Sequence, residues 1–179
     1  MSKDRATLVK ILRISIPLIL TALWIAFIWS NSLKNGVESG EDSGKALNMI
    51  SRITKFLGLG TPFSEHFIRK AAHFTEFAIL GALFCADLVC LRAVRFTQKL
   101  YVSAPLLLCS VPASAFIASA DEFIQRFSKG RGPSVKDVLI DTSGALCATI
   151  IFIAVFILVR SIHKKRCKAR VKKSTYIVA

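Results

Sequence analysis

Hydrophobic residues in this chain form four blocks that are separated by polar and charged segments. The blocks run from about 11 to 30, 71 to 91, 100 to 120 and 138 to 159. Each is close to the roughly 20 residues that a helix needs to cross a bilayer. The pattern predicts an all-α polytopic membrane bundle of four transmembrane helices, formed by a single domain over residues 1–179. Pro105 and Pro112 interrupt the third block, which a spanning helix tolerates when neighbouring helices satisfy the freed carbonyls.

The first block has a second interpretation. A basic start followed by an apolar core also describes a secretory signal peptide. Here the apolar core is at the long end for such a signal, and no A-x-A cleavage site follows before Ser30. A retained helix is therefore favoured.

The segment 31–70, between the first two blocks, contains a second periodic pattern. Leu47, Ile50, Ile53 and Leu57 recur at helical spacing, with polar residues between them. This predicts a short amphipathic helix over about 43–56, either on the membrane surface or packed against the bundle. Thr61-Pro62 resembles an N-cap and a first-turn proline, which would open the second spanning helix early.

Composition agrees with a membrane protein, because 53% of the residues are hydrophobic and the mean hydropathy is +0.53. The net charge of +14 could indicate nucleic-acid binding, but its distribution argues against that. The tail 160–179 contains a dense run of Lys and Arg with no acidic residue among them. A basic run directly after a hydrophobic helix is typical of a cytoplasmic end close to anionic lipid.

The same charges predict the orientation of the chain. With the N-terminus inside, the inner segments hold most of the basic residues: Lys3, Arg5, Lys10, Arg13, Arg92, Arg95, Lys99 and the basic tail. Most acids fall on the outer segments. The positive-inside rule then places both termini in the cytoplasm.

Five cysteines are present, four in hydrophobic blocks and one in the tail. None pair at metal-ligand spacing, and none face an oxidising compartment in this topology. They are expected to act as small hydrophobes rather than as a disulfide framework.

Three polar clusters that lie far apart in sequence converge on the outer membrane surface in this topology. At 100° per residue, Arg69, His73 and Glu76 share one helical face, and Asp137, Asp141 and Gly144 share another. Small residues below the two acids predict close packing on a neighbouring helix. The candidate ligand-binding residues are Asn31, Ser32, Arg69, Lys70, Asp121, Glu122, Gln125, Arg131, Ser134, Asp137 and Asp141.

These groups allow more than one chemistry. A network of ion pairs that locks the helices is the simplest alternative. A mixed site could instead hold a headgroup, with cations on phosphate and carboxylates on an ammonium group. His73 and Glu76 are candidate catalytic residues, with His73 as a general base oriented by Glu76. His73, Glu76 and Asp141 could make an oxygen-rich metal site, but a lone histidine is a weak signal and no metal ligand is assigned.

Asp87 returns to the helical face of Glu76 near the inner border. It is expected to be an interfacial acid that snorkels toward water; the alternative is an inner station on a transport path. The sequence contains no serine elbow, Walker loop or Rossmann glycine pattern, so no cofactor is assigned.

The polar clusters resemble the VanZ family. The resemblance rests on Trp29-Ser30-Asn31-Ser32, on the stretch 69–77 (RKAAHFTEF), on 121–127 (DEFIQRF) and on 130–144 (GRGPSVKDVLIDTSG). Phe77 departs from the family, which often shows Tyr there. The resemblance implies an integral protein of the bacterial cytoplasmic membrane, in a family whose name-giving member is linked to reduced susceptibility to teicoplanin.

Three functions remain open at this point. The first is a non-enzymatic module that binds membrane lipid, a lipid-linked wall precursor or a lipoglycopeptide at the outer leaflet. The second is an enzyme that modifies the headgroup of such a lipid. The third is an oligomeric lipid transporter, because four helices are few for a monomeric one. The sequence does not assign the oligomeric state.

Overall fold

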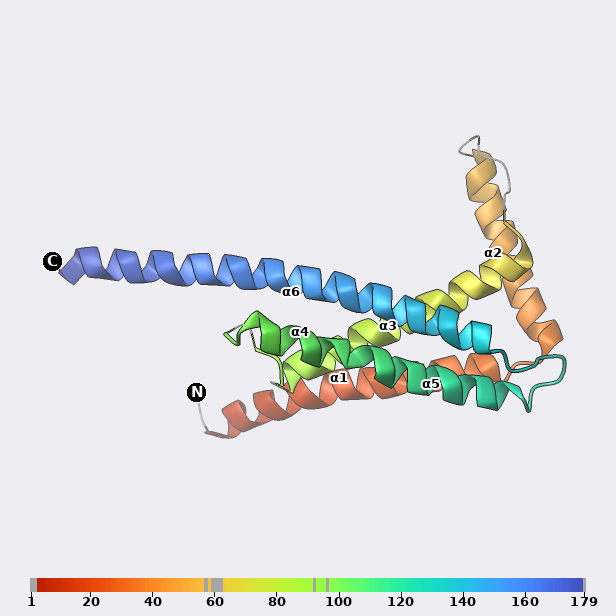
Figure 1. Ribbon diagram of the computed structural model, residues 1–179, viewed down its shortest axis with the longest axis horizontal. Coiled ribbons are helices and arrows are strands. Elements are labelled where there is room, and N and C mark those ends of the chain that lie inside the picture. Colours follow the sequence, from red (N-terminus) through yellow and green to blue (C-terminus); the bar gives the residue numbers. More distant parts are fainter. Residues whose placement is uncertain (1–2, 57, 59–62, 92, 96, 179) are drawn as a thin grey trace.

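The computed structural model is an elongated bundle of helices (Figure 1). It describes residues 3–56, 58, 63–91, 93–95 and 97–178, and the side chains of these residues except 3, 4, 6, 10 and 167–178. The described part is helical and contains no strand. Its helices are α1 (Lys3–Ser32), α2 (Gly36–Phe56), α3 (Glu65–Cys90), α4 (Leu100–Leu108), α5 (Ser110–Gln125) and α6 (Val135–Val178).

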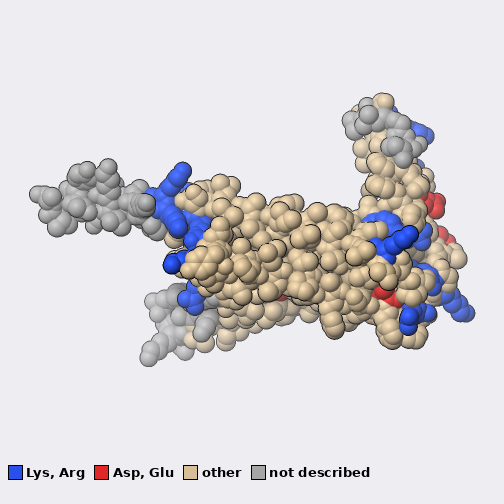
Figure 2. Space-filling model, viewed as in Figure 1, with Lys and Arg blue, Asp and Glu red and all other residues tan. Residues whose placement is uncertain are grey.

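Four helical stretches of the described chain are long and apolar enough to cross a membrane: Thr7–Ser32, Glu65–Cys90, Leu100–Gln125 and Val135–Arg166. Figure 2 shows a belt along the bundle that is almost free of charged residues, with Lys and Arg at both ends and most of the visible Asp and Glu at the end where α2 lies. The predicted class, a four-span all-α membrane protein, is confirmed. The two termini lie at the same end of the bundle, and α2 crosses the other end, which is called the α2 end below (Figure 1).

The second spanning helix begins at Glu65, six residues before the hydrophobic block. Its N-cap is Ser64, whose hydroxyl oxygen accepts a hydrogen bond from the backbone N–H of Phe67 at 3.2 Å. This bond satisfies one of the free donors at the helix start. The predicted cap at Thr61-Pro62 lies outside the described residues, and the cap of the described helix is Ser64.

The amphipathic helix is longer than predicted, because α2 begins at Gly36 rather than near 43. Asn35 and Glu38 form a reciprocal cap at this start. The Glu38 N–H donates to Asn35 Oδ1 at 2.9 Å, and the Asn35 N–H donates to Glu38 Oε2 at 3.2 Å. Asn followed three residues later by Glu is the sequence signature of such a capping box, and it fixes the helix start.

The third span is divided into α4 and α5 at Cys109. Pro112 explains the division, because a proline has no N–H for the carbonyl four residues earlier, that of Leu108, and its ring crowds that carbonyl. The backbone at Cys109 stays close to helical, with φ −62° and ψ −16°. The two pieces therefore continue in one direction as a single span (Figure 1).

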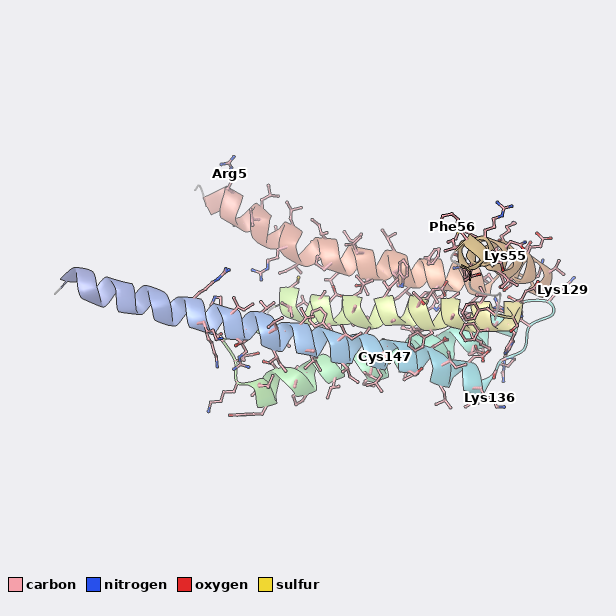
Figure 3. The ribbon with its side chains drawn as sticks, turned by 90° about the horizontal axis from the view of Figure 1, so that it is seen from above. Arg5, Lys55, Phe56, Lys129, Lys136 and Cys147 are labelled. Atoms are coloured by element: carbon pink, nitrogen blue, oxygen red, sulfur yellow. The ribbon has the colours of Figure 1, made fainter. Side chains whose placement is uncertain are left out.

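The closest helix contact joins α3 to α6. A Cβ on Gly81 would lie 2.8 Å from the carbonyl oxygen of Ala145, and a Cβ on Gly144 would lie 3.3 Å from the amide nitrogen of Ala78. The predicted close packing below Asp137 and Asp141 is confirmed at Gly144. Figure 3 shows α3 between α1 and α6, so α3 is the central helix.

Two buried clusters fill the bundle. Ile28, Phe77, Leu80 and Ala118 form one, nearer the α2 end; Cys85, Val94, Leu107 and Phe156 form the other. Cys85 packs as a small buried residue, as expected, and its thiol lies 3.4 Å from the Ser110 hydroxyl. The exposed thiols of Cys109 and Cys147 lie within spanning helices.

Asp87 does not snorkel. It is 6% exposed, and its Oδ2 accepts a hydrogen bond from the Thr21 hydroxyl at 2.8 Å. The expectation of a solvated interfacial acid was wrong because Thr21, on α1, offers a donor inside the bundle. The bond joins α1 to α3 away from the α2 end.

Candidate functional site

The candidate site lies at the α2 end, where α1 and α5 end and α3 and α6 begin (Figure 1). Three sequence clusters separated by about 40 residues or more meet here, and α2 lies over them. Hydrogen bonds and ion pairs join many of the residues that the sequence predicts for the site, and several of these residues also line two cavities.

Ser32 and Asp121 form the centre of a buried network. The Ser32 hydroxyl donates to Asp121 Oδ2 at 2.7 Å, and the amide of Gln125 donates to the same oxygen at 2.9 Å. The Ser128 hydroxyl donates to the Ser32 carbonyl at 2.8 Å. The network ties the end of α1 to the end of α5, so it positions the loop that follows α5.

Arg131 lies in that loop and reaches back over the bundle. Its Nη1 donates to the Asn31 carbonyl at 3.3 Å, and its Nη2 lies 3.3 Å from Nε2 of His73. Burial is the main cause that lowers the pKa of this guanidinium, although the charge of Asp121 opposes the effect. A guanidinium stays protonated in proteins, so Arg131 places a permanent cation beside His73.

The candidate catalytic pair is not in mutual contact. Asn31 Nδ2 donates to Glu76 Oε1 at 2.9 Å. The carboxylate that lies near His73 belongs to Asp141, whose Oδ1 is 3.8 Å from His73 Nδ1. Among the described contacts, Asp141 is thus the acid that can orient His73, whereas Glu76 holds the end of α1.

The remaining predicted residues close one side of the site. Lys70 forms an ion pair with Asp137, which joins α3 to α6. Glu122 Oε2 accepts a hydrogen bond from the backbone N–H of Ser134 at 2.7 Å. Ser134 therefore contributes its backbone amide to this contact. The residue does not line either of the two cavities at this end. The ion pair between Lys70 and Asp137 confirms part of the ion-pair alternative.

Two open cavities, of about 220 Å³ and about 180 Å³, meet at the α2 end. Three side chains line both of them: Arg69, His73 and Arg131. The larger cavity extends to Asn31 and Glu76, and the smaller to Lys70 and Asp137. Both are open, so a ligand can reach the shared cations from outside the bundle.

Sequence reasoning missed the contribution of α2 and its cap region. Lys34, Ser39, Asp42 and Ser43 also line the larger cavity. Lys34 donates to Asp42 at 2.9 Å, and this bond holds the pKa of the exposed Asp42 carboxyl below its usual value. The spacing of Ser39, Ser43 and Ala46 places them on one helical face. That spacing is the sequence signal from which a contribution of α2 to the site could have been predicted.

Comparison with known proteins agrees with the sequence motifs. A family model described as VanZ/LLP1 matches residues 17–159. This range contains all four polar stretches and most of the four spans. No curated protein and no solved structure matches the chain.

Proposed function

Because this chain belongs to the VanZ/LLP1 family of membrane proteins, we propose that it binds an amphiphile with an anionic headgroup at the α2 end, on the outer face of the bacterial cytoplasmic membrane. The ligand class is a lipid phosphate, such as a lipid-linked wall precursor. This ligand would connect the protein to the cell envelope and to the response to lipid-bearing glycopeptides such as teicoplanin.

One observation carries this proposal. Arg69 and Arg131 both line the two cavities, and neither belongs to an ion pair among the described residues. The Nε of Arg69 is buried without a hydrogen-bond partner. Guanidinium groups bind phosphate through parallel hydrogen bonds, and two of them without a carboxylate partner beside an open cavity favour an anion there.

The surroundings favour an amphiphile over a free anion. The larger cavity is also lined by Ile68, Ala46 and Ala72. On α2, Val37, Met49, Ile53 and Phe56 are exposed, and Phe56 is 90% exposed. An amphipathic helix that crosses the end of a spanning bundle lies at the depth of lipid headgroups, so acyl chains can pack beside it.

A binding measurement tests the proposal. Purified protein in phosphatidylcholine nanodiscs should bind dioctanoyl phosphatidic acid saturably. Arg69→Gln and Arg131→Gln should each weaken binding by at least about tenfold, because a hydrogen bond to a charged group contributes about 1.5–3 kcal/mol. Arg126→Gln is the matched control, since Arg126 is exposed in the same region and stacks on Phe123 at 5.8 Å.

Further ligands separate the possible sources of the headgroup. A polyprenyl diphosphate should compete for the same site, and inorganic phosphate alone should compete poorly. Teicoplanin is tested in the same competition. Equal binding of dioctanoylglycerol, which has no phosphate, would contradict the proposal; so would unchanged affinity in both arginine variants.

The orientation has its own test. In a background with the native cysteines replaced by alanine, Lys129→Cys should react with a membrane-impermeant maleimide on intact cells. Ser161→Cys should react only after permeabilisation. Lys129 points away from the bundle at the α2 end (Figure 3), and Ser161 is exposed near the opposite end. The reverse labelling pattern would place the site in the cytoplasm.

An enzyme is the second candidate, because His73 lines both cavities and Asp141 lies beside its Nδ1. This function predicts that His73→Ala abolishes turnover of a bound lipid phosphate while binding persists. Phosphate or headgroup release from polyprenyl diphosphate is the measurement. Absence of turnover in the wild-type protein leaves the binding function alone.

A further inference from the structure

His73, Asp121 and Asp141 bring their side-chain ligand atoms together at one point of the α2 end. The three residues belong to α3, α5 and α6, and one imidazole nitrogen and two carboxylate oxygens all lie within 4.8 Å of one another. Asp121 and Asp141 are 0% exposed. The sequence groups His73 with Glu76 and Asp141, but the fold replaces Glu76 with Asp121.

Four buried side-chain atoms of these three residues have no hydrogen-bond partner. They are Asp121 Oδ1, both oxygens of Asp141, and His73 Nδ1. Oδ1 of Asp121 stays open although its Oδ2 accepts two hydrogen bonds. Buried polar atoms are almost always paired, and buried charges are paired or coordinate metals, so four unpartnered atoms on three clustered residues require a cause.

The like charges around Asp141 also favour a cation at this place. Carboxylates of Glu76, Asp121, Glu122 and Asp137 all interact with Asp141 as like charges. The nearby Lys70 is committed to Asp137, and Arg131 faces the other side of His73. Like-charged carboxylates in one buried place need a proton or a cation between them.

We propose that His73, Asp121 and Asp141 bind one divalent metal cation. Two carboxylates and one imidazole suit Mn²⁺ or Zn²⁺, of which Zn²⁺ has the higher intrinsic affinity for such ligands, and Mg²⁺ is the weaker competitor. Ligand atoms about 2.2 Å from one ion lie at most about 4.4 Å apart, so the side chains need to move by only a few tenths of an ångström. Open coordination positions would face the cavities that His73 lines.

The hydrogen bond from Arg131 to His73 couples metal binding to the position of Arg131. Arg131 can only donate, so the Nε2 of His73 accepts from it and the ring proton sits on Nδ1. A metal on Nδ1 requires that proton to move to Nε2, where it would face Arg131. Metal binding therefore displaces Arg131 from His73. The guanidinium of Arg131 is then available to bind a ligand in the cavity. Metal binding itself does not depend on headgroup binding.

The test is metal binding by the full chain in phosphatidylcholine nanodiscs, with no anionic lipid present. Loss of the free Mn²⁺ signal in electron paramagnetic resonance should show one saturable site. His73→Gln and Asp141→Asn should each weaken it more than about 100-fold, because losing an outer-shell partner alone costs about 10–100-fold. Asp121→Asn is a third variant with the same expectation.

The controls distinguish a metal site from general effects. Glu41→Gln removes an exposed acid of α2 and should leave Mn²⁺ affinity unchanged. Arg131→Gln should tighten Mn²⁺ binding by at least about threefold, because it removes a cation and the competing donor, and misfolding cannot produce such a gain. Absence of a saturable site for Mn²⁺, Zn²⁺ and Mg²⁺ would overturn the inference. So would Mn²⁺ affinity that is unchanged in His73→Gln and Asp141→Asn.

Discussion

Gly144→Ala is expected to separate α6 from α3 and to destabilise the bundle strongly. A Cβ at this position would overlap the carbonyl oxygen of Phe74 and lie 3.0 Å from its carbonyl carbon. Both atoms are backbone, so no side-chain rotation relieves the overlap. Overpacking of a close contact costs about 1–3 kcal/mol and more where backbone must move. The contact lies one turn below Asp141, so the site should be lost with it.

The measurement is the thermal midpoint of purified protein in detergent, followed by tryptophan fluorescence and size-exclusion chromatography. Gly40→Ala is the matched control, because a Cβ on Gly40 meets nothing within 4 Å, and alanine favours a helix over glycine. Gly40→Ala should therefore keep or raise the midpoint, while Gly144→Ala lowers it by several degrees. Equal midpoints for the two variants would show that α3 and α6 do not pack as described.

The spans could be predicted because membrane crossing imposes a strong condition on the sequence: about 20 apolar residues with few charges. The helix ends were less accessible, because hydropathy does not register caps. Ser64 caps the start of α3 with one hydrogen bond, and Asn35 and Glu38 cap the start of α2 with two, all outside the apolar blocks. The sequence has Pro112 inside the third block, but only the structure shows that it divides the third span at Cys109.

The convergence of the site followed from topology, because α1, α3, α5 and α6 place their polar ends on one side of the membrane. Helical spacing correctly predicted that Gly144 packs closely on a neighbouring helix, and the structure identifies that helix as α3. The partner of each side chain could not be predicted, because it depends on the rotation and depth of helices that are far apart in sequence. For this reason Glu76 faces Asn31 rather than His73, and Asp87 faces Thr21 rather than water.

The second large effect is expected at Asp141, with the opposite sign. Asp141→Asn should stabilise the protein when metal is absent. The side chain is 0% exposed and neither oxygen has a hydrogen-bond partner. An asparagine of the same size removes a negative charge from a group of carboxylates, and its amide can donate toward the open Oδ1 of Asp121. Removing one buried unpaired charge should raise stability by about 1–3 kcal/mol, since leaving a buried polar group unsatisfied costs about that amount.

Asp137→Asn provides the matched comparison, because it makes the same chemical change one helical turn away. Asp137 pairs with Lys70, and its side chain is 22% exposed, so the substitution removes a partly screened ion pair. It should lower stability by up to about 1 kcal/mol. Thermal midpoints in chelator-treated detergent solution should therefore move in opposite directions for the two variants.

Added Mn²⁺ should then raise the midpoint of the wild type and leave that of Asp141→Asn unchanged. If Asp141→Asn instead destabilises the metal-free protein, the Asp141 carboxylate has a structural role in the bundle, and its open oxygens do not mark a ligand site.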